Sequence, residues 1–387
     1  MNKRQLGITA AIIACAFALS RCISKPTPPA DPRGEQYAAA NTCASCHQSV
    51  YDAYTQTAHA HTSALATAGT VKGDFNAPGN VFHFSNGTEV VLEKKGERLV
   101  QRTNGQEQPF DIVIGSGRKA QTSLYWQNGQ YFQLPISWFV PANSWANSPG
   151  FPADHPKFDR VIPSTCFGCH SSMIGIAEVK QENLQLKETF EHNKLLAGID
   201  CQRCHGPAAE HVDYHNQHPQ EKTAHAMKHP GKLSRQQQLD MCALCHSGLK
   251  PMQRSAFDFK PGDALSEFLM PTAPFPSKQV DVHGNQYQLL TASKCFSGSQ
   301  QMTCGSCHDP HTSERSNMQV FSQRCMSCHQ PDSPQFCKLR SKPSATLQQN
   351  CIDCHMPAQP STAITLLTNG QQSPTADSIR THMIAVY

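Results

Sequence analysis

The sequence Cys-x-x-Cys-His occurs seven times in this chain, and no other feature constrains its fold as strongly. In such a motif two thiols add to the vinyl groups of a porphyrin, and the histidine that follows ligates the iron. Seven copies therefore predict a chain that folds around seven covalently bound c-type haems. The motifs, numbered in chain order, are Cys43, Cys46 and His47; Cys166, Cys169 and His170; Cys201, Cys204 and His205; Cys242, Cys245 and His246; Cys304, Cys307 and His308; Cys325, Cys328 and His329; and Cys351, Cys354 and His355.

Structural zinc sites also use Cys-x-x-Cys pairs, and they are the alternative interpretation of these motifs. A zinc site does not require a histidine directly after the second cysteine, and zinc knuckles come in matched pairs. Here the number of motifs is odd and every copy carries the histidine. The pattern therefore favours haem over zinc.

The N-terminus is typical of a bacterial export signal. Lys3 and Arg4 precede a mostly apolar stretch from Leu6 to Leu19, which is too short for a comfortable transmembrane helix. The next residues resemble a lipobox that ends in Cys22, although Arg21 stands where a small residue is expected. We expect a signal peptide at residues 1–22, export to the periplasm, and tethering to a membrane as a lipoprotein through Cys22.

Three alternatives for the N-terminus stay open. The letters Ile12-Ile13-Ala14-Cys15 fit a lipobox better but leave a very short apolar region, simple cleavage after Ala18 gives a soluble exported protein, and an uncleaved signal gives a membrane anchor. Residues 23–40 are rich in proline and polar side chains, so we expect them to form a tether.

The formal net charge of +4 does not indicate a nucleic-acid partner. Each haem carries two propionates, and seven haems would make the loaded protein acidic. The lysines and arginines are scattered along the chain rather than collected in a run that could follow a phosphate backbone. We therefore expect no nucleic-acid binding.

Motif spacing divides the chain. No motif lies between His47 and His170, and this stretch contains short runs typical of strands, separated by turn signals such as Asn104-Gly105. We expect an antiparallel β-meander, inserted at residues 75–150 between a first haem segment at 41–74 and a six-haem segment at 151–387. The predicted fold class is a multihaem cytochrome c made mainly of short helices and loops packed around the haems, with this β-insertion.

Three helices can be predicted outside the insertion. Ser234 and Gln237 form a capping box that opens a helix leading into Cys242. The stretch from Ser316 to Cys325 reads as a second helix that ends in a motif. The stretch from Glu178 to Leu196 is the longest helical candidate, although it lacks a clean apolar face.

Saturating seven irons requires seven second axial ligands, and thirteen of the twenty histidines lie outside the motifs. The preferred second ligands are His61, His211, His229, His311 and His382. Weaker candidates are His59 (the alternative to His61), His83, His155 and His283. We expect His215 and His218 on a solvated helix edge, and for every one of these histidines the alternative is a side chain satisfied by hydrogen bonds.

Two cysteines, Cys295 and Cys337, belong neither to a motif nor to the signal. In an oxidising compartment such a pair favours a disulfide, and two buried free thiols are the alternative.

Eight stretches carry a family resemblance, namely residues 43–54, 57–61, 131–138, 145–150, 166–170, 198–207, 302–311 and 351–357. They resemble the cytochrome c-552/4 family of c-554-like multihaem cytochromes. The resemblance spans about residues 40–385 and implies stacked haem pairs whose irons are ligated by two histidines. The wider superfamily contains both electron carriers and enzymes, so the resemblance alone does not decide the activity.

We expect an electron-transfer protein that relays electrons between redox partner proteins, such as a quinol-linked donor or another cytochrome. The alternative is a multihaem oxidoreductase that acts on a small nitrogen or sulfur compound at one open iron. The isolated first motif, at His47, is the candidate for that iron. No catalytic residue is predicted, because no motif is altered and no tyrosine lies in a distinctive context.

Overall fold

The computed structural model describes residues 30–39, 41–183, 185–270, 280–339 and 347–387. Strands make up 27% of the chain and helices 24%, and the largest unit is an eight-stranded antiparallel sheet. The predicted fold of mainly short helices and loops around haems is therefore wrong. Antiparallel sheets form at least as much of the molecule as helices do, and they are not confined to the predicted insertion.

The eight-stranded sheet joins distant parts of the chain. Its order is β1-β6-β7-β9-β10-β13-β14, with β8 paired to β7. The first strand comes from the segment of the first motif, and the last two follow the seventh motif, so the sheet connects both ends of the chain to the insertion. The strands are β1 (Ser63–Leu65), β6 (Ile112–Ile114), β7 (Ala120–Gln127), β8 (Gln130–Gln133), β9 (Ile136–Phe139), β10 (Ser144–Asn147), β13 (Ala358–Thr368) and β14 (Thr375–Arg380).

A second sheet packs beside the first and consists of β2 (Val81–His83), β3 (Glu89–Lys95), β4 (Arg98–Thr103) and β5 (Gln106–Pro109) in sequence order. The turn signals of the insertion are confirmed, since Asn104 and Gly105 both take positive φ angles between β4 and β5. The two sheets share a core of buried aromatic and aliphatic side chains that includes Phe82, Leu92 and Trp145.

The predicted helix from Glu178 to Leu196 is wrong. This stretch forms a two-stranded antiparallel hairpin of β11 (Ser171–Glu182) and β12 (Gln185–Ala197). Asn183 adopts a positive φ of 48°, which turns the chain between the strands. Only the first part of β11 is buried, so the outer half of the hairpin has no packed apolar face that would support a helix.

The helices are short, and most of them carry a motif. The predicted capping box of Ser234 and Gln237 and the predicted helix that runs into Cys325 are both confirmed. The helices are α2 (Ala44–Tyr54), α3 (Ser164–His170), α4 (Cys201–His205), α5 (Ala209–Gln217), α6 (Arg235–His246), α7 (Gln286–Thr291), α8 (Lys294–Ser297), α9 (Met318–Met326) and α11 (Ile352–His355). Short 3₁₀ turns lie at η1 (Pro230–Lys232), η2 (Ala256–Asp258), η3 (Leu265–Glu267) and η5 (Cys304–Ser306).

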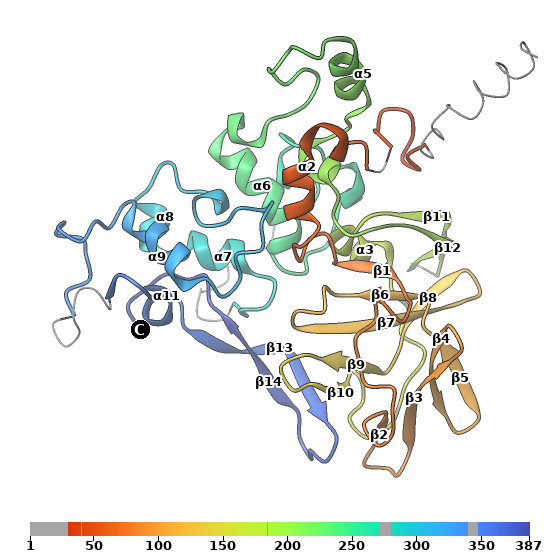
Figure 1. Cartoon of the computed structure of the whole chain (residues 1–387). Helices are drawn as coiled ribbons and strands as arrows, with labels where there is room; N and C mark the ends of the chain where they lie inside the picture. The colour runs from red at the N-terminus through yellow and green to blue at the C-terminus, as the bar shows by residue number, and fades with distance from the viewer. Residues whose placement is uncertain (1–29, 40, 184, 271–279, 340–346) are drawn as a thin grey trace, which may run out of the picture.

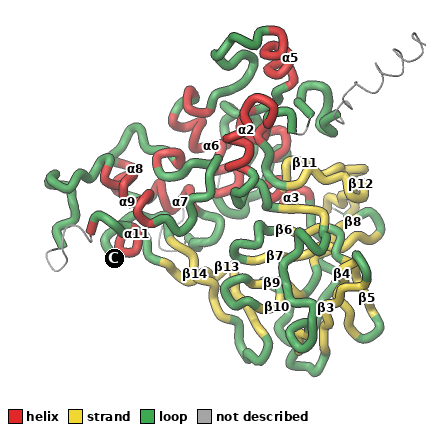
Figure 2. Tube along the Cα trace, in the orientation of Figure 1, coloured by secondary structure: helices red, strands yellow, loops and turns green. Residues whose placement is uncertain are grey.

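Strands and helices occupy different parts of the molecule. Figure 1 shows the sheets at the lower right, with the motif-bearing helices above them and to the left. Figure 2 shows the same separation by colour, with β13 and β14 reaching from the helical part to the sheet. In the described ranges no helix has the length and hydropathy needed to cross a bilayer. The predicted signal peptide, including Cys22, lies outside the described residues.

Candidate functional site

Each motif folds into about one helical turn. The backbone N–H of the motif histidine donates to the carbonyl of the first cysteine, at 2.8 Å for His47 and at 3.0 Å for His308 and His329. Residues at positions i, i+3 and i+4 of a helical turn share one face. Both thiols and the imidazole of a motif are therefore presented together to a porphyrin.

Four motif histidines face a second imidazole. The ring centres are 6.5 Å apart for His47 and His211, and 6.0 Å apart for His205 and His311. A metal–imidazole bond is about 2.0 Å long and the ring centre lies about 1.1 Å beyond the nitrogen, so two rings on opposite sides of one iron would have centres about 6.2 Å apart. These distances fit an iron held between two histidines.

The other two facing pairs have the same spacing. His246 faces His59 with ring centres 6.2 Å apart, and His308 faces His382 at 6.1 Å. The planes of His246 and His59 are nearly perpendicular, at 74°, whereas those of His308 and His382 are inclined by 29°. In each of the four pairs, one ring comes from a motif and the other from a different segment of the chain.

The predicted second ligands divide into two groups. His211, His311 and His382 each lie opposite a motif histidine. His61 does not: its Nε2 contacts the carbonyl of Thr55 at 2.7 Å, on the protein surface, and His59 takes the position opposite a motif. His229 lies near His205 but not opposite it, because His311 occupies that position.

A tight turn fixes His59. The carbonyl of His59 accepts a 2.8 Å hydrogen bond from the backbone N–H of Ile199, and the hydroxyl of Tyr54 donates to the carbonyl of Ile199. Gly198 has a φ of +68°, and a Cβ there would lie 2.3 Å from the carbonyl oxygen of Ala60. Only glycine allows this approach, so the segment before the third motif positions the histidine that faces the fourth.

Hydrogen bonds at Nδ1 orient several of these rings. The Nδ1 atom of His355 contacts the carbonyl of Ala385 at 2.8 Å, and that of His329 contacts the carbonyl of Gln335 at 3.0 Å. His211 contacts the carbonyl of His225 through Nδ1 in the same way, at 2.9 Å. An imidazole that donates from Nδ1 leaves Nε2 unprotonated, which is the form that ligates iron.

Burial favours the neutral form of five of the eight facing imidazoles. It lowers the pKa of His59 and of His382 to about 4 in each case. Burial also lowers the pKa of His205, His246 and His308. A histidine must be neutral to donate its lone pair, so these environments favour iron ligation over protonation near neutral pH.

Thiols of different motifs contact one another. The thiol of Cys201 donates a hydrogen bond to Cys43 and lowers the pKa of Cys43 to about 7. A hydrogen bond from Cys325 lowers the pKa of Cys351 to about 6. Two further contacts join the second motif to the fourth and the fourth to the fifth, namely Cys169 with Cys245 and Cys304 with Cys242. The motifs therefore lie side by side, and their order in space differs from their order in the chain.

The three remaining motif histidines have other surroundings. In the described ranges, the rings of His170, His329 and His355 make no ring contact with a second imidazole. His283, one of the weaker candidates, lies close enough to His170 to lower its pKa, although burial is the larger cause.

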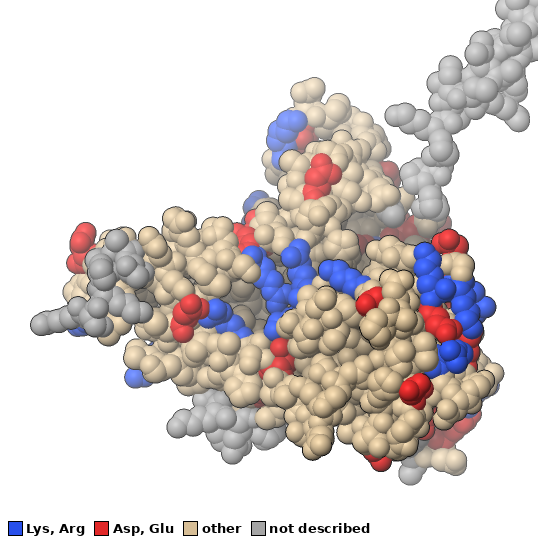
Figure 3. All heavy atoms as spheres, turned by 60° about the horizontal axis from the view of Figure 1, so that its bottom comes forward, with Lys and Arg blue, Asp and Glu red and all other residues tan. Residues whose placement is uncertain are grey.

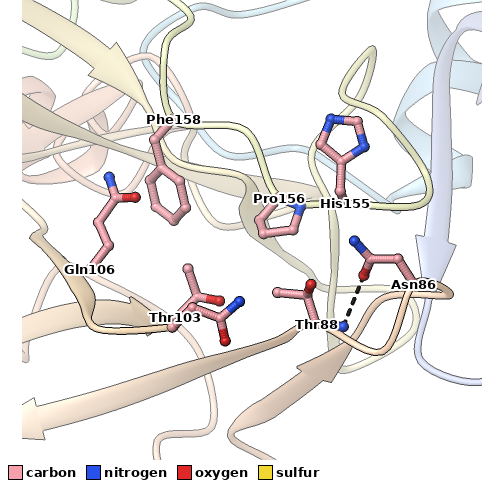
Figure 4. Close-up of a pocket in the computed structure, with 8 residues that line it drawn as sticks. Asn86, Thr88, Thr103, Gln106, His155, Pro156 and Phe158 are labelled. Atoms are coloured by element: carbon pink, nitrogen blue, oxygen red, sulfur yellow. Dashed lines mark hydrogen bonds between the residues drawn. The ribbon is translucent and has the colours of Figure 1, made fainter.

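Two other histidines and the two spare cysteines do not join a motif. His83 pairs with Glu89 at 3.1 Å on β2. His155 pairs with Asp154 at 2.8 Å beside a surface cavity of about 270 Å³ in the strand-rich part (Figure 4). No motif residue lines that cavity. Cys295 and Cys337 are free thiols, so the predicted disulfide does not form in this structure.

For one pair of candidates, the structure places His59 opposite a motif histidine and not the preferred His61. His59 and His61 both follow the first motif closely, and the sequence named both without a means of separating them. The signal that separates them is Gly198, whose missing side chain permits the contact with Ala60. That contact joins residues more than a hundred positions apart, and a single sequence does not reveal it.

Comparison with known proteins supports the motif assignment. The family model described as "Cytochrome c554 and c-prime" matches residues 42–76 and 152–206, which is about a quarter of the chain. The two segments contain the first three motifs together with His59 and Gly198. No curated protein and no solved structure matches the chain. Over these segments the chain is similar to cytochrome c554 and c-prime, which are c-type cytochromes with covalently bound haem iron that take part in electron transfer.

Proposed function

We propose that this protein is a seven-haem c-type cytochrome that relays electrons between redox partners in the periplasm. The observation that carries the proposal is the set of four facing histidine pairs, each with the spacing that one iron with two ligands requires. Haem supplies reversible one-electron exchange when it is bound. The chain supplies attachment, axial ligands and a fixed arrangement.

The contacts between motifs support a relay rather than a set of isolated sites. Cys43 and Cys201 join the first motif to the third, and Cys325 and Cys351 join the sixth to the seventh. The helix α6 contacts both its neighbours, through Cys245 toward the second motif and through Cys242 toward the fifth. Short distances between attachment points favour electron exchange between neighbouring groups.

Several second histidines follow one motif in the chain and face another, which also supports a relay. His211 follows the third motif and faces the first, and His311 follows the fifth and faces the third. His382 follows the seventh motif and faces the fifth. Because each facing pair bridges two segments, the distances between the sites are fixed by the fold and not by flexible loops.

One observation weighs against the alternative of an enzyme with an open iron at the first motif. His211 lies opposite His47 with nearly parallel rings, inclined by 16°. Two axial histidines saturate an iron and leave no position for a substrate. An oxidoreductase of small nitrogen or sulfur compounds stays a prediction without a site at His47.

The partners and the location belong to the proposal as well. We propose a quinol-linked donor or another cytochrome as partner, and a lipid anchor at Cys22. On the face in Figure 3 lysines and arginines form one group near the centre and a second group at the right, and the second group has acidic side chains among it. Along the sequence the basic residues are scattered, so we propose a protein partner rather than a nucleic acid.

Two measurements on the purified holoprotein test this function. Intact mass spectrometry is expected to give seven haems per chain, and six or fewer would refute the complete relay. Low-temperature EPR of the oxidised protein is expected to show low-spin iron at the four paired sites. A high-spin fraction above three sevenths would contradict the pairing, and a spectral change at one site on adding nitrite, hydroxylamine or sulfite would favour the enzyme.

A further inference from the structure

Part of the segment predicted as a tether is docked on the third motif. Arg33 donates hydrogen bonds to both carboxylate oxygens of Asp31, at 2.8 and 2.9 Å, and it also bonds both oxygens of Asp200. Asp200 is the residue directly before Cys201. The side chain of Arg33 is only 9% exposed, so this ion pair is shielded from solvent and holds the N-terminal segment at the start of α4.

A second contact fixes the same segment. The buried side-chain amide of Gln202 accepts from the N–H of Ala38 at 2.9 Å and donates to its carbonyl at 3.0 Å. The carbonyl of Gln36 accepts from the N–H of Ala209 at the start of α5. Since Gln202 and Ala38 are both buried, residues 31–38 are part of the folded body and not a free linker.

The chain between the lipobox cysteine and this docked segment is short. From Cys22 to Ala30 a fully extended chain spans at most about 29 Å. A folded body of this length has a radius of gyration of about 21 Å, and a sphere with that value is about 54 Å across. If the side opposite the docked segment touched the membrane, the docked segment would lie about 54 Å away, beyond the reach of the tether.

We propose that the docked segment orients the protein on the membrane, with the end that carries α2, α4 and α5 facing the lipid surface. This inference rests on the proposed lipid anchor at Cys22. Figure 1 shows α2 and α5 in the upper part of the molecule and α9 and α11 at the left. The helix α2 carries the first motif and α4 the third, whereas α9 and α11 carry the sixth and the seventh. Electrons from a membrane-bound donor therefore reach the first and third motifs, and the sixth and seventh face a soluble partner.

The test uses the full lipidated holoprotein on vesicles of phosphatidylethanolamine and phosphatidylglycerol. Hydroxyl-radical footprinting, read by mass spectrometry, compares vesicle-bound protein with protein in detergent. We expect at least twofold protection of α2 and α5 on vesicles and no protection of the β2–β5 sheet. Protection of the sheet, or of α9 and α11, would overturn the orientation.

A spacer variant separates orientation from folding and from anchoring. Twenty Gly/Ser residues inserted between Pro29 and Ala30 leave the docked segment intact and lengthen the reach. We expect this variant to stay on vesicles and to lose the protection of α2 and α5. Unchanged protection would show that the tether does not set the orientation. Retained binding of Cys22→Ser to vesicles would instead reject the anchor, and the EPR measurement decides the relay independently.

Discussion

Replacing His59 with alanine is expected to change the ligation of one iron in seven. The ring of His59 lies opposite the ring of His246, with centres 6.2 Å apart. Alanine removes this imidazole ring and keeps the backbone of residue 59. The backbone carbonyl of His59 still accepts from Ile199 in the variant. The loss is therefore confined to the sixth ligand of the iron at the fourth motif, and the local main chain is kept.

The expected signal follows from this count. One iron of seven loses its second histidine, so about a seventh of the total iron converts from low spin to high spin or binds an added ligand. Spin quantitation by low-temperature EPR measures that fraction against the wild type. Added imidazole is expected to fill the vacated position and restore the low-spin signal, which would not happen if His59 only supported packing.

His61→Ala is the matched control. His61 is two residues away and exposed, and its Nε2 contacts a backbone carbonyl. We expect its EPR spectrum to match that of the wild type. A high-spin fraction in His61→Ala and none in His59→Ala would refute the assignment, and high-spin iron in neither variant would refute the ligation of the fourth motif by this segment.

Four other outcomes can be checked. Gly198→Ala is expected to unfold at a lower temperature than the control variant Gly370→Ala. Both variants replace a glycine at positive φ, but only the Cβ at position 198 would meet a backbone oxygen, at 2.3 Å. Equal melting temperatures of the two variants would contradict the close approach at Gly198. Ser234→Ala is expected to cost about 1 kcal/mol of unfolding free energy, because it removes the N-cap of α6; denaturant unfolding measures this, and a loss below about 0.3 kcal/mol would dismiss the cap. Burial raises the pKa of Asp281, but hydrogen bonds from His283, Thr362 and Ser361 outweigh it and lower the pKa to about 2. The stabilisation by Asp281 is thus complete above about pH 4 and lost toward pH 2, so Asp281→Asn should flatten the acid limb of the stability curve, and the exposed Asp258→Asn should not. Cys22→Ser is expected to release the protein from membranes in a fractionation assay.

The motif residues could be read from the sequence because their spacing is local. A thiol pair and the following histidine lie on one helical turn, and the turn forms in the structure as expected, for example from Cys304 to His308. Three of the five preferred second ligands, His211, His311 and His382, also lie opposite a motif histidine. The first two follow a motif closely, but each of them faces a motif histidine more than a hundred residues earlier in the chain. The sequence therefore indicates the ligand and not the motif that it faces.

The remaining features depend on long-range contacts. The strands β13 and β14 join the sheet by pairing β13 with β10, more than two hundred residues earlier, and no local pattern indicates that partner. The hairpin of β11 and β12 is hard to distinguish from a helix in the sequence, because its length and polar composition suit either structure. Asn183, which turns the chain between the two strands, was the available signal.

The segment Gly198–Gln202 contacts parts of the chain that belong to several motifs. Gly198 and Ile199 contact the turn that contains His59. Asp200 and Gln202 bind the N-terminal segment through Arg33 and Ala38. Ser172, which lies just after the second motif, donates a 2.8 Å hydrogen bond to the carbonyl of Gly198. Three separate parts of the chain therefore converge on the residues that lead into the third motif. Because His59 faces the fourth motif, a disturbance of this segment is expected to affect the first, second and fourth sites together. The contacts of these three parts of the chain thus meet at the third motif, although it is not the first motif in the chain.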